Sequence, residues 1–149
     1  MRIAIVDDIA QERQLLRQRL EHSLEARGVP GELTEFESGE AFLEAARQQR
    51  FTAAFLDIYM DGISGMEAAT QLRQFDPECL LIFSTTSTDH ALEGFRVRAM
   101  HYLVKPYAQK DISQLMEEIL ARIPQPDRYI PVKANGSEVQ LPLRDIVYA

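Results

Sequence analysis

The chain has 149 residues, 46% of them apolar, which is enough to bury one core but too little for two full domains. Twenty-three acidic against 16 basic residues give a net charge of −7, which disfavours binding of nucleic acid or anionic lipid by the chain as a whole. The single cysteine excludes an internal disulfide, and no apolar run approaches the roughly 20 residues that span a bilayer, so we expect a cytoplasmic protein without membrane contact.

Short apolar runs alternate five times with longer segments of helical period. The predicted strands are 2–6, 32–36, 53–56, 80–83 and 102–104, and the predicted helices are 10–26, 39–49, 65–74, 89–98 and 109–122. This alternation is typical of a parallel sheet with helices on both faces. We predict an α/β fold of the flavodoxin-like kind, a doubly wound (βα)5 sheet of strand order 2-1-3-4-5. Ligands of such folds bind at the carboxyl ends of the strands.

Local signals support several helix ends. Gly28 and Pro30 are expected to stop the first helix, and Ser38 is a candidate N-cap of the second. Asp111 suits the positive end of the last helix.

The pattern changes after residue 123. Prolines at 124 and 126 predict a linker over 124–128, and β-like runs follow at 129–133 and 138–143. The Asn135-Gly136 pair between them predicts a β-hairpin. Because an isolated hairpin is marginal in water, we expect it to pack on the rest of the chain or on a neighbouring copy, which would give a homodimer.

Three acidic residues follow neighbouring strands of the predicted sheet. Asp7 and Asp8 end the first strand and Asp57 ends the third. Taken singly, each has an ordinary explanation as a solvated strand end or a helix cap. Three clustered anions, however, repel one another unless a cation lies between them, and hard oxygen ligands suit Mg²⁺. The triplet therefore predicts a magnesium site.

A hydroxyl and an ammonium follow the two remaining strands. Thr85 comes after the fourth strand and Lys105 after the fifth, although alone they are as readily a strand cap and a surface charge. Facing a metal and carboxylates, they supply what a transferable phosphoryl group needs: charge neutralisation and a directional hydrogen bond. Asp57 is then the candidate nucleophile. Pro106 also allows a cis bond after the lysine.

Taken together, these motifs resemble the receiver domain of bacterial two-component response regulators over residues 1–123. They are Asp7-Asp8, Leu56-Asp57-Ile-Tyr-Met60, Gly65, Thr85 and Tyr102-Leu-Val-Lys105-Pro106.

The resemblance implies phosphorylation of Asp57 by a sensor histidine kinase, with Lys105 and Thr85 contacting the phosphoryl group. It also implies Mg²⁺ held by Asp7, Asp8, Asp57 and the backbone carbonyl of Tyr59, and a switch in which Tyr102 turns inward as Thr85 moves.

Residues 129–149 resemble the opening strands of a LytTR-type DNA-binding domain. This implies a transcription regulator whose DNA-contacting part lies beyond Ala149, so we expect no sequence-specific DNA binding from this chain.

One departure from many receivers is Asp61-Gly62, where a proline commonly follows the methionine, so we expect a looser loop after Tyr59. Tyr59 itself is bulky, and we hypothesise that it hinders the water that would hydrolyse a phosphorylated Asp57.

Two other functions stay open. A Mg²⁺-dependent phosphatase that works through an aspartyl phosphate is disfavoured, because Tyr59 stands where a second acid would protonate a leaving group. An interaction module that is never phosphorylated is disfavoured by the intact acidic triplet with Thr85 and Lys105. The signalling switch turns over no independent substrate, so we do not expect an enzyme.

Overall fold

The computed structural model describes residues 1–86 and 96–123 with their side chains, and the backbone of 129–134 and 137–142. The strands of the main unit are β1 (Arg2–Val6), β2 (Glu32–Phe36), β3 (Ala53–Leu56), β4 (Leu80–Thr85) and β5 (Ala99–Val104). Its helices are α1 (Ala10–Arg27), α2 (Gly39–Gln48), α3 (Gly65–Arg73) and α5 (Gln109–Arg122).

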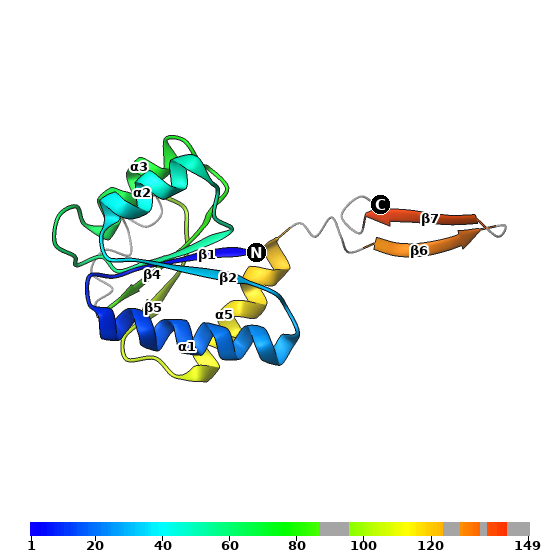
Figure 1. The fold of residues 1–149 in the computed structure, drawn as a ribbon, viewed down its shortest axis with the longest axis horizontal. Coiled ribbons are helices and arrows are strands. Elements are labelled where there is room, and N and C mark those ends of the chain that lie inside the picture. The colour runs from blue at the N-terminus through cyan, green and yellow to red at the C-terminus, as the bar shows by residue number, and fades with distance from the viewer. Residues whose placement is uncertain (87–95, 124–128, 135–136, 143–149) are drawn as a thin grey trace. The chain divides into compact units, whose positions relative to one another are not determined.

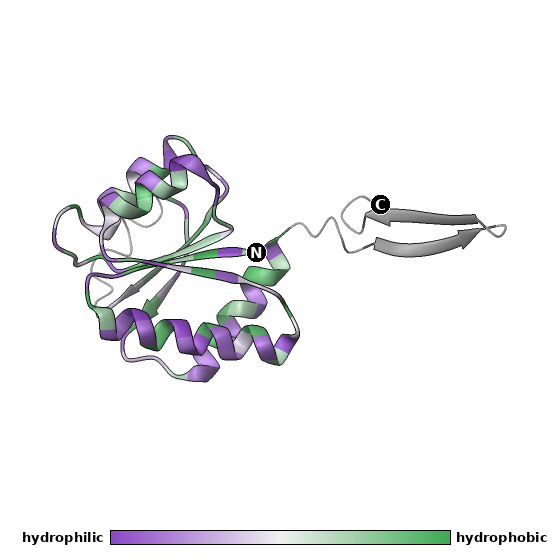
Figure 2. Cartoon of the chain, in the orientation of Figure 1, coloured by the Kyte–Doolittle hydropathy of each residue, from purple (hydrophilic) through white to green (hydrophobic). Residues whose placement is uncertain are grey.

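The five strands form one parallel sheet of order β2-β1-β3-β4-β5, which confirms the predicted fold. Helices α1 and α5 cover one face of the sheet, and α2 and α3 cover the other (Figure 1). The central strands β1 and β3 are buried almost throughout, as parallel strands between two helical layers must be. Hydrophilic residues lie mainly on the helices (Figure 2).

The helix ends follow the sequence signals closely. Gly28 caps α1 with a left-handed φ of 64°, where a residue with a side chain would be strained. The Ser38 side chain accepts a hydrogen bond from the backbone N–H of Ala41 at 3.1 Å and so begins α2. Ser64 and Glu67 form a reciprocal capping box at the start of α3, which the sequence reading did not identify.

Two strands are longer than predicted. β4 continues to Thr85 because Ser84 and Thr85 are buried and pair with Leu103 and Val104. β5 begins at Ala99, directly after a turn in which Arg98 has a φ of 54°. Most of the predicted helix 89–98 lies outside the described residues.

Residues 120–149 form a second compact unit that contains an antiparallel pair, β6 (Tyr129–Ala134) and β7 (Ser137–Pro142). Its register runs from Tyr129 opposite Pro142 to Ala134 opposite Ser137, as expected for a hairpin. The linker and the Asn135-Gly136 turn lie outside the described residues. In the described part of the chain, no helix is long and apolar enough to cross a membrane.

Candidate functional site

The three predicted aspartates meet at the carboxyl edge of the sheet. Asp7 and Asp8 directly follow β1, and Asp57 follows β3, whose last residue Leu56 is paired with Val6. One carboxylate oxygen from each of the three lies within 4.8 Å of the others. Asp7 and Asp57 are buried and Asp8 is half-buried, so their negative charges are held together with limited access to water.

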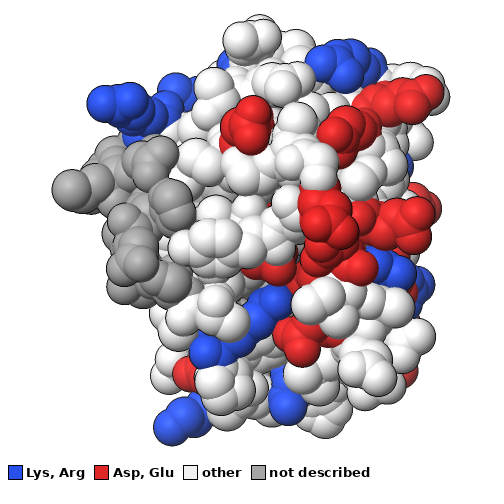
Figure 3. Space-filling model, turned by 90° about the vertical axis from the view of Figure 1, so that its left-hand side faces the viewer, with Lys and Arg blue, Asp and Glu red and all other residues white. Residues whose placement is uncertain are grey.

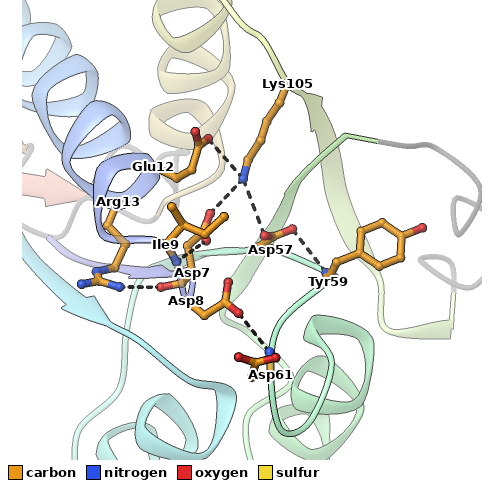
Figure 4. Close-up of polar contacts among 9 residues, drawn as sticks. All are labelled: Asp7, Asp8, Ile9, Glu12, Arg13, Asp57, Tyr59, Asp61 and Lys105. Atoms are coloured by element: carbon orange, nitrogen blue, oxygen red, sulfur yellow. Dashed lines mark hydrogen bonds and ion pairs between the residues drawn. The ribbon is translucent and has the colours of Figure 1, made fainter.

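Lys105 projects into this cluster from the end of β5 (Figure 4). Its Nζ donates to Asp7 Oδ2 at 2.9 Å, and it lies 3.3 Å from Glu12 Oε1 and 3.6 Å from Asp57 Oδ2. The peptide bond between Lys105 and Pro106 is cis. The side chain of Lys105 is only 12% exposed, so these ion pairs are shielded from solvent.

Backbone groups hold the carboxylates in place. The N–H of Tyr59 donates to Asp57 Oδ1 at 3.3 Å, and that of Ile9 donates to Asp7 Oδ1 at 2.9 Å. The N–H of Asp61 donates to Asp8 Oδ2 at 3.0 Å, which ties the loop after β3 to the end of β1 (Figure 4). The site is therefore built from strand ends and short turns, and its geometry is fixed by backbone hydrogen bonds.

Burial and repulsion alter the proton affinities. Burial raises the pKa of Asp57 from 3.8 to about 6; the nearby Lys105 charge and the Tyr59 N–H oppose this rise, and the charges of Asp7 and Asp8 add to it. Burial by itself would lower the pKa of Lys105. The hydrogen bond to Asp7 and the charges of the surrounding carboxylates outweigh burial, and that pKa is raised above 10.5. The site thus places the Lys105 ammonium, largely shielded from solvent, among carboxylates.

These residues fit a hard divalent cation. The three aspartates offer oxygen ligands on rigid strand ends and carry more negative charge than Lys105 compensates. Asp7, Asp8 and Asp57 are the side chains that would hold Mg²⁺. The structure places the backbone N–H of Tyr59 against Asp57, and the role predicted for its carbonyl stays a prediction.

The predicted switch residues occupy the neighbouring strands. Thr85 is fully buried at the end of β4, and its carbonyl accepts a hydrogen bond from the N–H of Lys105 at 2.8 Å. The Tyr102 ring is half-buried on β5 and packs against Phe83, with 5.3 Å between ring centroids. Thr86, rather than Thr85, lines the pocket beside Asp57.

A pocket of about 560 Å³ opens beside Asp57. Ile9, Leu15 and Tyr107 give it an apolar rim, and Glu12 and Arg19 bring charges from α1. The sequence reading did not single out these α1 residues. Glu12 lies in the first turn of α1, close behind Asp8 in the sequence, and this was the one available signal, whereas Arg19 lies near the middle of the helix. Figure 3 views the carboxyl end of the strands and shows acidic side chains gathered there, with basic ones beside them.

Comparison with known proteins points to one family. A sequence profile described as response regulator receiver domain matches residues 3–117. The sensory transduction protein LytT of Bacillus subtilis is 29% identical over 118 residues, which are 79% of this chain and 47% of that protein. The transcriptional regulatory protein LytR of Staphylococcus aureus is 27% identical over 135 residues, or 91% of this chain and 53% of LytR. The chain thus spans about half the length of these curated relatives.

Solved structures agree with the sequence comparison. The response regulator TrrA of Thermotoga maritima, crystallised in complex with Mg²⁺-BeF, superposes with a TM-score of 0.68 at 27% identity and covers 79% of this chain and 97% of TrrA. The BeF3-activated receiver domain of DrrB gives a TM-score of 0.65 at 26% identity and covers 80% of this chain and 97% of that domain.

Proposed function

Because the chain belongs to the response regulator receiver domain family, we propose that it is a switch that accepts a phosphoryl group on Asp57 from a sensor histidine kinase. The observation that carries this proposal is the convergence of Asp7, Asp8, Asp57 and Lys105 at one edge of the sheet. An acceptor, a cation site and a fixed ammonium are the parts that phosphoryl transfer to a carboxylate requires.

The transfer exchanges one bond for another. The phosphorus–nitrogen bond of a phosphohistidine breaks and its electron pair returns to the imidazole, while an Asp57 oxygen forms the new phosphorus–oxygen bond. With a pKa of about 6, Asp57 is ionised at neutral pH and needs no base. Lys105, 3.6 Å from Asp57 Oδ2, is near enough to bind the incoming phosphoryl oxygens. Bound Mg²⁺ supplies further charge neutralisation.

The pocket beside Asp57 provides the place for the donor. It reaches the acceptor carboxylate directly and combines an apolar rim with charges from α1. A histidine carried on an amphipathic helix of the kinase has the matching chemistry. The imidazole would approach Asp57 past Ile9 and Tyr107.

Thr85 and Tyr102 are proposed to carry the signal onward. Thr85 ends β4 next to the site, and Tyr102 lies on the adjacent strand with its ring against Phe83. A phosphoryl group that draws the Thr85 hydroxyl inward would leave space for the Tyr102 ring and so change the outer surface of β5.

The output is proposed to be regulation of transcription through a LytTR-type domain that begins at residue 129, after a linker over 124–128. The alignment with LytR supports this, because its 135 residues are more than residues 1–123 can contain. DNA binding by such a domain would need residues beyond Ala149.

Incubation with phosphoramidate, a small phosphorus–nitrogen donor, and Mg²⁺ tests the proposal by intact mass. We expect one added phosphoryl group that hydroxylamine removes, as an acyl phosphate requires, and none in Asp57→Asn. An unmodified wild-type chain would favour the interaction module that is never phosphorylated. Sustained hydrolysis of a generic phosphate ester would favour the phosphatase.

A further inference from the structure

Among the residues that the structure describes, Glu12 is the one carboxylate that contacts Lys105 but lies outside the group of three aspartates. Its Oε1 is 3.3 Å from Lys105 Nζ, closer than the 3.6 Å that separates this ammonium from Asp57 Oδ2 (Figure 4). The aspartate oxygens that fit a cation come from Asp7, Asp8 and Asp57. Glu12 therefore competes with Asp57 for the ammonium without being part of the cation site.

The backbone holds Glu12 in this place. Glu12 lies in the first turn of α1, and its N–H donates to the carbonyl of Ile9 at 3.1 Å. Ile9 in turn is fixed to the site, because its own N–H donates to Asp7 Oδ1. The side chain is 35% exposed and lines the same pocket as Asp57. Glu12 thus lies beside the lysine on the wall of the pocket that a phosphoryl donor would enter.

A cation bound by the three aspartates changes this competition. With a cation bound there, the charges of Asp7 and Asp57 would be compensated, whereas the charge of Glu12 would be left with Lys105 as its partner. The attraction of Glu12 for the Lys105 ammonium would then be stronger relative to that of Asp7 and Asp57. This would happen just when Lys105 has to turn toward the phosphoryl oxygens.

We propose that Glu12 is a positioning residue that holds Lys105 back from Asp57 and so slows acceptance of the phosphoryl group. This inference rests on the proposed function. Glu12 acts in two ways that have the same direction: it competes for Lys105, and its charge repels an anionic donor in the pocket.

Two substitutions separate these effects. Glu12→Gln removes the charge, and Glu12→Asp keeps the charge on a side chain one methylene shorter, which withdraws it from Lys105. With phosphoramidate and saturating Mg²⁺, we expect Glu12→Gln to raise the rate constant of phosphorylation about three- to tenfold. Glu12→Asp should also raise it, by about two- to threefold. The matched control is Glu21→Gln, which removes an exposed charge on the same helix that pairs with Arg17.

Equilibrium binding gives a readout that is independent of the reaction rate. The affinity for the beryllium trifluoride anion, a phosphoryl analogue, should rise about three- to tenfold in Glu12→Gln. The dissociation constant of Mg²⁺ alone should change by less than about threefold, because Glu12 is not among the cation ligands. In a Lys105→Gln background, Glu12→Gln should raise the affinity for the analogue clearly less than in the wild type, and the gain that remains measures the repulsion between the Glu12 charge and the anion.

The outcomes separate the two proposals. A wild-type chain that takes no phosphoryl group refutes the proposed function itself. A wild-type chain that is phosphorylated while Glu12→Gln is equally fast or slower refutes only the role of Glu12. If Glu12→Gln is phosphorylated faster than the wild type but Glu12→Asp is not, the positioning role is overturned. Repulsion between the charge and the donor then explains the whole effect.

Discussion

Two buried aspartates of this chain lie in opposite environments. Burial makes the ionised form of Asp57 unfavourable and raises its pKa, and the charges of Asp7 and Asp8 add to this effect. Asp76 instead accepts hydrogen bonds from the N–H groups of Glu78 and Cys79, at 2.9 and 3.1 Å. A buried carboxylate destabilises the fold in the first case and stabilises it in the second.

Asp57→Asn is expected to stabilise the metal-free protein at neutral pH. The folded chain binds the Asp57 proton more tightly than the unfolded chain, because the pKa is about 6 instead of 3.8. The stability linked to this proton is complete below about pH 3.8 and is lost as the pH rises through about 6. In the presence of a chelator at pH 7.5, urea unfolding should give a gain of about 1–2 kcal/mol for the variant.

The gain should shrink toward zero as the pH falls to 4.5, where the wild-type carboxyl group is already protonated in the folded state. Asp76→Asn is the control, and we expect it to lower the free energy of unfolding by about 1–3 kcal/mol at pH 7.5. A loss of stability in Asp57→Asn at pH 7.5 would contradict the electrostatic account of the cluster.

Tyr59→Asn is expected to shorten the life of the phosphorylated state. Tyr59 lines the pocket with Asp57 and is 49% exposed as a residue, and its ring points away from the carboxylates (Figure 4). A smaller, polar side chain should admit the hydrolytic water more easily and speed loss of phosphate about three- to tenfold. Intact mass followed over time measures the decay, and an unchanged half-life would remove this role for Tyr59.

The sequence was sufficient to predict the residues on strand ends but not those on the helix. Asp7, Asp57 and Lys105 follow from strand order, because parallel strands bring their carboxyl ends to one edge. Glu12 and Arg19 come from α1, and their reach into the pocket depends on how that helix is rotated against the sheet. A single sequence gives little information on this rotation.

At the scale of elements, the start of α3 lies close to the end of β3, and this contact fixes the position of Asp57. Gly65 begins α3 and donates its N–H to the carbonyl of Ile58 at 2.9 Å. A Cβ at this position would overlap the backbone carbonyl of Asp57. The glycine is therefore required by contact with the acceptor residue, whereas Gly28 at the end of α1 is required by its φ.

A pair of glycine substitutions tests this difference. Gly65→Ala should displace Asp57 and weaken Mg²⁺ binding about tenfold or more, measured by calorimetric titration. Gly28→Ala has open space around its Cβ and should cost about 1 kcal/mol of stability through its positive φ, with Mg²⁺ affinity unchanged. Equal Mg²⁺ affinities in wild type and Gly65→Ala would contradict the proposed contact.

Strand lengths show where sequence patterns lose information. Ser84 and Thr85 are polar, so the apolar run appears to end at Phe83, yet both residues are buried and paired with β5. Polar residues at the end of a central strand are typical of a site, and an apolar pattern underestimates such strands. Helix ends were predicted more closely because Gly28 and Ser38 act through local hydrogen bonds.

At the scale of the whole molecule, the hairpin after residue 128 needs a surface to pack on. We predict that it packs on the receiver unit or on a second copy, because two strands alone bury too little apolar surface to be stable. If the hairpin packs on a second copy, light scattering should give a dimer for residues 1–149 and a monomer for a chain that ends at Ile123; if it packs on the receiver unit, the full chain should be a monomer whose hairpin amides are protected from exchange. A monomer of the full 149 residues whose hairpin amides exchange at once would contradict this prediction.

The central claim is that Asp57 accepts a phosphoryl group with the help of a divalent cation. The most direct measurement is mass spectrometry of tryptic peptides after incubation with phosphoramidate, with Mg²⁺ or with a chelator. Cleavage after Arg50 and Arg73 yields one peptide that contains Asp57. The account predicts one phosphoryl group on Asp57 in this peptide, present only with Mg²⁺. A phosphoryl group on another residue, or equal modification with the chelator, would contradict it.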